Sequence, residues 1–271
     1  MSIAFFLRNH LAGILVGGLV VASLVAGGVA FVRLGTLPDS TAPPTSSILP
    51  PLATSSPGGS PPALDRSSPY RGAPVTELKP DLKLLAGIPE ATYQRSLSEL
   101  GALAGRIAEN PHDTESWMRV AFIKHFYSDD LGARDAYEYL NVVANDYALP
   151  FYNLANLYGY YLKDPIKAIP KYQAAIARDS LEVSYYIGFA EFYRDVLGDR
   201  DRGFEVLRAA EAKTPGNPTL WTTLAAFYKG RDNPAEAIRY YEKALSFSAL
   251  GPNERAAIVV EVERLKRILV Q

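Results

Sequence analysis

The chain has 271 residues, enough for one sizeable domain and accessory segments. Its 28 basic and 29 acidic residues nearly cancel, so charge gives no reason to expect nucleic acid as a partner. The chain contains no cysteine, which excludes disulfides, thiolate catalysis and cysteine metal sites.

A membrane anchor is predicted for residues 1–33. Residues 11–32 carry no charge, and about 20 apolar residues span the hydrocarbon core of a bilayer. The alternative is a cleaved signal peptide, because Gly28-Val29-Ala30 matches a small-x-small cleavage site. The uncharged run is longer than the roughly 7–15 apolar residues of a signal peptide, which favours the anchor. Arg8 before the run and Arg33 after it nearly balance, and the short basic tail favours a single-pass anchor with the following domain outside the cytoplasm.

Small residues recur along one face of this predicted membrane helix, beginning with a GxxxG pair. Such a ridge lets helix backbones approach closely in lipid and predicts a second membrane helix as a partner. Gly and Ala are also frequent in membrane helices generally, which leaves that explanation open. The ridge consists of Gly13, Gly17, Gly18, Ala22, Ala26 and Ala30.

Residues 34–80 are predicted to form a disordered linker. The stretch from Pro38 to Pro80 holds 11 of the 20 prolines, with many Ser and Thr and almost no large apolar residue before Leu78. Such a segment cannot bury enough apolar surface to offset its ordering entropy. The linker is therefore expected to act as a tether, or to lie ordered along a partner.

Helical periodicity begins at Pro89 and continues to the C-terminus. A helix that ends at Asn110-Pro111 is predicted as the second helix of a partial repeat. Four aromatic residues then recur at steps of 34, 35 and 35 residues, at Trp117, Phe151, Tyr186 and Trp221. A repeat of this length predicts stacked units of one supersecondary type.

The last unit has the most complete pattern. It reads Trp221-x-x-Leu224-Ala225-x-x-Tyr228, followed by Ala237-x-x-x-Tyr241-x-x-Ala244. This pattern resembles the tetratricopeptide repeat (TPR). The resemblance implies an all-α fold over residues 81–271, a TPR-type α-solenoid of antiparallel helix pairs that follows the transmembrane helix.

Two cap motifs and one long connection are expected within the array. Asp164-Pro165 and Asn233-Pro234 are predicted to begin second helices, with proline at the first helical position. In the unit that starts at Trp117, the connection through residues 128–134 is expected to be longer than the family norm. The packing set after that connection is predicted to be Ala136, Leu140 and Val143.

A C-terminal capping helix is predicted after Pro252. The end of a solenoid needs one apolar face toward its neighbour and one polar face toward water. Glu261 is assigned to the polar face, which points away from the array. The predicted packing residues are Ile258, Val262, Leu265 and Leu269.

No catalytic or metal-binding motif is found in the sequence. The three histidines, His10, His112 and His125, have no zinc-binding spacing, and the phosphate-binding glycine motifs are missing. The sequence therefore predicts a protein that is not an enzyme and that has no cofactor and no metal.

The TPR resemblance implies a concave groove, lined by the first helix of each pair, that holds a protein or peptide partner. Inward positions in the family follow the first aromatic residue by one, five and eight residues. Tyrosine and arginine at such positions combine a large contact area with hydrogen bonding. The predicted groove residues are Phe122, Tyr152, Asn156, Tyr160, Glu191, Arg194, Thr222 and Lys229.

Three functions are compatible with these elements. The leading hypothesis is a membrane-tethered TPR scaffold or adaptor that helps to assemble or stabilise a membrane-associated complex. The alternative is a permanent accessory subunit, held in a membrane protein complex through its transmembrane helix. A secreted soluble scaffold would require cleavage near Ala30.

Overall fold

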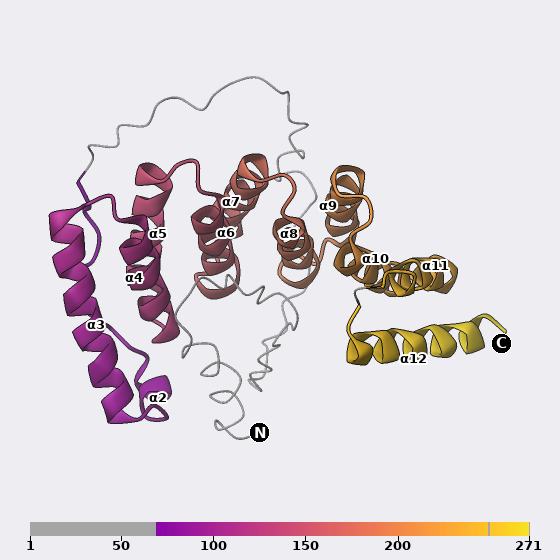
Figure 1. Cartoon of the computed structure of the whole chain (residues 1–271), viewed down its shortest axis with the longest axis horizontal. Coiled ribbons are helices and arrows are strands. Elements are labelled where there is room, and N and C mark those ends of the chain that lie inside the picture. The colour runs from indigo at the N-terminus through magenta and orange to yellow at the C-terminus, as the bar shows by residue number, and fades with distance from the viewer. Residues whose placement is uncertain (1–68, 249, 271) are drawn as a thin grey trace, which may run out of the picture. The chain divides into compact units, whose positions relative to one another are not determined.

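The computed structural model describes residues 69–248 and 250–270, and every regular element among them is a helix (Figure 1). The predicted membrane helix with its small-residue ridge, and residues 34–68 of the predicted linker, lie outside the described residues. None of the described helices is long and apolar enough to cross a membrane. The elements are α2 (Leu82–Leu85), α3 (Glu90–Glu109), α4 (Thr114–Phe126), α5 (Asp130–Val143), α6 (Ala148–Asn156), η1 (Leu157–Tyr161), α7 (Pro165–Arg178), α8 (Val183–Asp195), α9 (Arg200–Lys213), α10 (Pro218–Gly230), α11 (Pro234–Leu245) and α12 (Pro252–Leu269).

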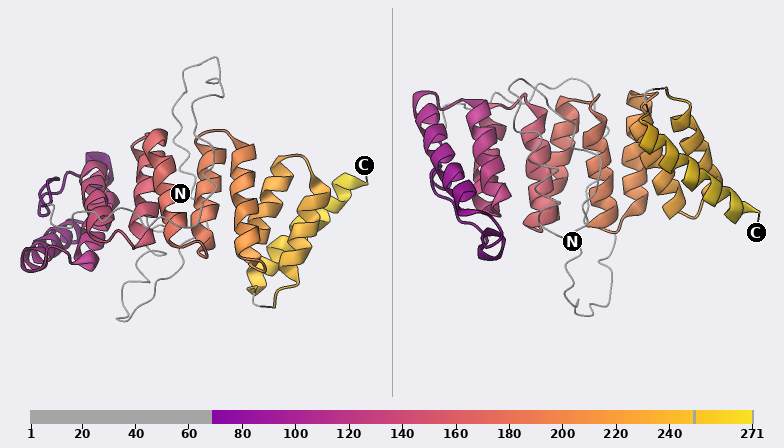
Figure 2. Two further views of the ribbon diagram at one scale, coloured as in Figure 1. Left: turned by 90° about the horizontal axis from the view of Figure 1, so that it is seen from above. Right: turned by 60° about the horizontal axis from the view of Figure 1, so that its bottom comes forward.

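The helices from α4 to α11 form four antiparallel pairs in chain order. These pairs are α4 with α5, α6 and η1 with α7, α8 with α9, and α10 with α11. Helix α8 also contacts both α6 and α10, so first helices of neighbouring pairs lie side by side (Figure 2). Helix α3 packs on α4, and α12 packs on α11 through buried Ile258, Val262 and Leu265. The predicted all-α array of helix pairs and the predicted end helix are confirmed.

The turn between the two helices of each of these pairs contains the same two-residue motif. A residue with a left-handed backbone is followed directly by an Asp or Asn that caps the second helix. The cap side chain accepts a hydrogen bond of 3.0–3.1 Å from the backbone N–H three residues on, which satisfies a donor that the helix leaves free. The left-handed residues and their caps are Ser128 with Asp129, Lys163 with Asp164, Gly198 with Asp199, and Asp232 with Asn233.

The first complete pair differs from its sequence prediction. The predicted long connection through residues 128–134 is wrong, because Asp129 caps α5 and the helix already begins at Asp130. Counting from the caps, Ala133, Tyr137 and Leu140 stand where the next pair has Ala168, Tyr172 and Ala175. The predicted set of Ala136, Leu140 and Val143 is buried but follows a different register.

Residues 70–80, here called the N-terminal strap, pack on the first pair. The Tyr70 ring lies 4.5 Å from the ring of Trp117 on α4 and 5.5 Å from that of Tyr139 on α5. The backbone N–H of Ala73 donates a 2.9 Å hydrogen bond to Asp135 on α5. The prediction of disorder up to residue 80 is therefore wrong for the strap, because one aromatic ring and a few backbone groups give it a specific binding site.

Lys124 of α4 binds the strap through hydrogen bonds to two of its backbone carbonyls. Its side chain is fully buried, and its Nζ donates to the carbonyl oxygens of Pro74, at 3.2 Å, and Glu77. The same nitrogen lies 3.2 Å from the carboxylate of Asp129. Burying an ammonium group is costly unless it is both paired and hydrogen-bonded, and the strap supplies two of its three partners. At the equivalent position the other three pairs carry Tyr158, Tyr193 and Tyr228.

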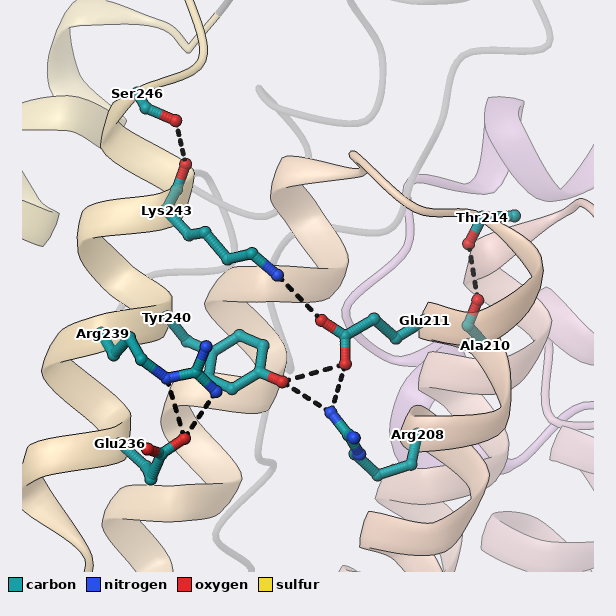
Figure 3. A network of polar contacts seen from close by, with 9 residues as sticks. All are labelled: Arg208, Ala210, Glu211, Thr214, Glu236, Arg239, Tyr240, Lys243 and Ser246. Atoms are coloured by element: carbon teal, nitrogen blue, oxygen red, sulfur yellow. Dashed lines mark hydrogen bonds and ion pairs between the residues drawn. The ribbon is translucent and has the colours of Figure 1, made fainter.

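A polar network joins the second helices of the last two pairs. In Figure 3, Arg208 and Glu211 of α9 point toward Tyr240 and Lys243 of α11. Lys243 Nζ and the Tyr240 hydroxyl donate to Glu211 at 3.1 Å and 2.9 Å. Burial alone would raise the pKa of Glu211, but the hydrogen bonds from Lys243 and Tyr240 lower it below its ordinary value. The ionised carboxylate therefore stabilises the contact between these pairs.

Candidate partner-binding surface

The candidate surface is formed by the first helices α4, α6 with η1, α8 and α10, and is called the first-helix surface below. In the second and third pairs the cap follows the first aromatic residue by 13 positions (151 to 164 and 186 to 199), one more than the 12 positions of the outer pairs (117 to 129 and 221 to 233). In the second pair the π-helical turn η1 absorbs the extra residue. Such turns are frequent at functional sites.

The π-helical turn carries three tyrosines, of which Tyr158 is buried and Tyr160 and Tyr161 are partly or largely exposed. The Tyr161 ring meets His125 of α4 edge-on at 4.4 Å, and His125 Nδ1 lies 2.8 Å from Asp130. The Tyr160 ring lies 6.1 Å from Phe192 of α8. The turn therefore links the surface of the second pair to the pairs on both sides.

Five of the eight predicted groove residues come together between α6, η1 and α8. Asn156 accepts a 2.5 Å hydrogen bond from the hydroxyl of buried Tyr172. Burial raises the pKa of the Tyr160 hydroxyl above its usual range, and the carboxylates of Asp195 and Glu191 beside it raise it further. Tyr152 and Arg194 complete this cluster of Tyr152, Asn156, Tyr160, Glu191 and Arg194, here called the central cluster.

Tyr152 is a packing residue as well as a surface residue. Its ring lies 5.0 Å from the ring of Tyr185. A Cβ atom at Gly188 of α8 would collide with the Tyr152 hydroxyl, so the glycine makes room for the tyrosine. Tyr152 and Asn156 therefore hold α6 against its neighbours, and replacing them would disturb the fold together with any binding.

The charges of the central cluster are unevenly satisfied. The Arg194 guanidinium makes a bidentate contact with Asp195, at 2.6 Å and 2.9 Å, and lies 5.2 Å from the Phe227 ring. Its distance to the Glu191 carboxylate is 3.6 Å. Burial raises the pKa of Glu191, Arg194 opposes the shift and Asp195 adds to it. The carboxylate of Glu191 is thus partly removed from water and weakly compensated.

Phe122 lies apart from the central cluster, near α3. Its side chain is 53% exposed, and the Arg119 guanidinium lies 5.3 Å from its ring. Arg119 in turn forms a bidentate pair with Glu99 of α3. Phe122 and Met118 line an open hollow of about 450 Å³ between α3 and α4.

Thr222 and Lys229 lie on α10 and are already engaged. The Thr222 hydroxyl donates to the Thr219 carbonyl of its own helix at 2.9 Å. Lys229 Nζ lies 2.9 Å from Glu261 of α12. The prediction that Glu261 points away from the array is wrong, because this carboxylate faces the C-terminal end of α10 and pairs there.

The ion pair between Lys229 and Glu261 predicts a titration result. Hydrogen bonding from Arg264 lowers the pKa of Glu261 to about 2, burial opposes the shift, and Lys229 adds to it. A carboxylate with a lowered folded-state pKa stabilises the fold above its unfolded value of about 4.3 and loses that effect as pH falls toward the folded value. In NMR titrations we expect Lys229→Met to raise the pKa of Glu261, while Lys213→Met, at an exposed position on α9, leaves it unchanged. Equal values in both variants would contradict the pairing.

Sequence reasoning missed Tyr161, Asp130 and Asp195 as parts of this surface. The one available signal was the extra residue before the caps Asp164 and Asp199. An extra residue shifts the register at the end of the first helix, so different side chains reach the surface there. Within residues 69–248 and 250–270, no group of three or more His, Asp or Glu side chains is placed to hold a metal ion.

No protein-family model and no curated protein matches the chain. Among solved structures, the chain is similar to MamA, with 21% identity and a TM-score of 0.45 over 54% of this chain and 84% of that chain. It is also similar to YrrB, described as a TPR protein with an unusual peptide-binding site, with 14% identity and a TM-score of 0.45 over 65% and 86% of the two chains. A third similar structure is TTC0263, a thermophilic TPR protein in Thermus thermophilus, with 19% identity and a TM-score of 0.46 over 66% and 96%.

The fold is a TPR-type array of helix pairs. This conclusion rests on the geometry of residues 69–248 and 250–270, in which α4 to α11 form four antiparallel pairs with equivalent caps and with first aromatic residues 34 or 35 residues apart. The identities and TM-scores of the similar structures are too low to transfer a function. What the first-helix surface does is therefore inferred from its own contacts.

Proposed function

We propose that the chain is a membrane-tethered TPR scaffold whose first-helix surface binds a protein or peptide partner and helps to assemble or retain a membrane-associated complex. The observation that carries the proposal is the central cluster, which combines tyrosine rings, an amide and both signs of charge on neighbouring first helices. Such groups are typical of interface hot spots. The tether is inferred from the uncharged run of residues 11–32.

Exposed aromatic surface extends the proposed binding site beyond the central cluster. Phe122 is 53% exposed and Tyr161 is 55% exposed, and both belong to first-helix segments. Large exposed apolar side chains that lie near polar groups are common at protein interaction sites. Glu191 and Arg194 take part in ion pairs, and the amide of Asn156 accepts a hydrogen bond, so these side chains are held in place for binding a partner. The proposed scaffold has no enzymatic role.

Site-specific photo-crosslinking tests this function. A photo-reactive phenylalanine analogue is introduced at Phe122 or Tyr160 in the full-length chain in its native membranes. Ala209, which is exposed on the second helix α9, is the matched control position. We expect discrete adducts from the first two positions and none from Ala209. Adducts of equal yield at all three positions would contradict a role for the first-helix surface.

The second candidate function is a permanent accessory subunit held through its membrane helix. It is favoured by the ridge from Gly13 to Ala30, where small residues would allow close packing in lipid. Replacing Gly17 and Gly18 by isoleucine would then release the chain from its complex, and the crosslinks at Tyr160 would be absent from the start. Release by the isoleucine substitutions together with crosslinks at Tyr160 would mean that the two contacts act together.

The scaffold domain is proposed to lie outside the cytoplasm. The chain has no cysteine, so a single Ala209→Cys residue can report the side of the membrane through a maleimide that does not cross bilayers. Labelling of intact cells or spheroplasts supports the proposed side. Labelling only after lysis places the domain in the cytoplasm. The intact mass of the purified chain tests whether residues 1–30 are removed.

A further inference from the structure

We propose that the central cluster receives a cationic side chain, so that the partner of this chain presents a lysine or arginine to it. The proposal rests on the proposed function, in which the first-helix surface binds a polypeptide. The occupant is identified from charge complementarity and from the aromatic rings around Glu191.

The first observation is that Arg194 is already committed. It makes a bidentate contact with Asp195, at 2.6 Å and 2.9 Å, and its guanidinium lies over the Phe227 ring. The 3.6 Å contact with Arg194 is the one ion pair of Glu191 among the described residues. A second cation can therefore approach Glu191 without displacing an existing bidentate pair.

The second observation is the excess of carboxylates along this part of the surface, although the whole chain is nearly neutral. Besides burial, the negative charges of Glu182 and Glu191 raise the pKa of the Tyr152 hydroxyl, and those of Asp195 and Glu191 raise the pKa of the Tyr160 hydroxyl. Burial and the charge of Asp130 raise the pKa of Tyr161 in the same way. The basic groups nearby are engaged, because Arg194 binds Asp195, His125 contacts Asp130 and Lys229 pairs with Glu261. An acidic segment would be repelled here, and a purely apolar one would cover Glu191 without compensating its charge.

The third observation is the nature of the surrounding side chains. The hydroxyls of Tyr152 and Tyr160 are near enough to Glu191 for its charge to raise their pKa, and both side chains are partly exposed. Aromatic rings attract cations, and a carboxylate in a partly buried position binds an ammonium or guanidinium group more strongly than in open water. The tyrosines and the incompletely compensated charge of the Glu191 carboxylate together favour a basic side chain over a neutral polar one.

The test is selection of peptides from a random dodecamer display library on the full-length protein in detergent. Lysine and arginine are expected to be enriched at least about threefold in the selected peptides. The strongest binder is then measured against two variants that remove the same charge, Glu191→Gln in the central cluster and Glu205→Gln on the exposed side of α9. We expect an affinity about tenfold lower for Glu191→Gln, as for the loss of one charge-assisted hydrogen bond, and no change for Glu205→Gln.

The outcomes separate this inference from the proposed function. Selected peptides without basic enrichment, or basic peptides that bind Glu191→Gln as well as the wild type, overturn the inference but leave peptide binding in place. Failure to select any peptide counts against peptide binding by the surface and against the inference with it. A circular dichroism spectrum and a melting temperature equal to wild type establish that Glu191→Gln is folded.

Discussion

Replacing Lys124 by alanine is expected to loosen the first helix pair and the N-terminal strap while the last pairs stay folded. The variant removes a fully buried ammonium group, which takes the donor from two strap carbonyls and the buried counter-ion from the Asp129 carboxylate. Removing one partner from a buried charge pair costs about 3–5 kcal/mol. In a repeat array each unit contacts its neighbours only, so the loss is expected to stay local.

Hydrogen–deuterium exchange of the full-length chain measures this effect. We expect faster exchange in α3, α4, α5 and the strap, with α10 and α11 unchanged. Lys229→Ala is the control, because this exposed lysine forms a surface ion pair of about 0–1 kcal/mol. A uniform change across all pairs, or none in α4 and α5, would show that the strap does not hold the first pair.

Replacing Gly203 by alanine is expected to destabilise the domain, although alanine is the residue that the other pairs carry at this position. Four residues after each cap, the other pairs have fully buried alanines, Ala133, Ala168 and Ala237. A Cβ atom on Gly203 would lie 2.7 Å from the Ala190 carbonyl oxygen and 2.8 Å from the Phe227 ring. Overpacking of this kind costs about 1–3 kcal/mol, which outweighs the gain of roughly 0.5–1 kcal/mol from alanine in a helix.

Gly101 on α3 provides the matched control for this substitution. It lies inside a helix, it is exposed, and a Cβ atom there would meet no atom within 4 Å. Gly101→Ala is therefore expected to stabilise the chain by about 0.5–1 kcal/mol, opposite in sign to Gly203→Ala. Denaturant unfolding of both variants compares the signs directly. Stabilisation by both substitutions would show that α8 and α9 are less closely packed at Gly203.

The spacing of the aromatic residues was sufficient to predict the helix pairs. Trp117, Phe151, Tyr186 and Trp221 are each the fourth residue of a first helix, and a period near 34 residues has few other physical explanations. Asp164 and Asn233 were predictable caps because a proline follows each of them. Asp129 is not followed by proline, so the sequence offered no comparable sign that α5 begins at Asp130.

The contacts of the strap and of the first-helix surface could not be predicted from the composition of the sequence or from the spacing of its repeats. A proline-rich composition averages over dozens of residues, whereas the strap is held by Tyr70 and by carbonyls that bind one buried lysine. The predicted groove residues Tyr152 and Glu191 lie near one another, but the residues that they contact were not predictable. Tyr172 belongs to α7 and Gly188 to α8, and only the packing of these helices brings them against Asn156 and Tyr152 of α6.

The central claim is that a partner binds across the first helices of neighbouring pairs. Its most direct test is hydrogen–deuterium exchange of the full-length chain, alone and in the complex isolated with its partner by gentle detergent extraction. We predict new protection at α6, η1 and α8, with the exposed side of α9 unchanged. Protection confined to the second helices, or to the membrane segment alone, would contradict the claim.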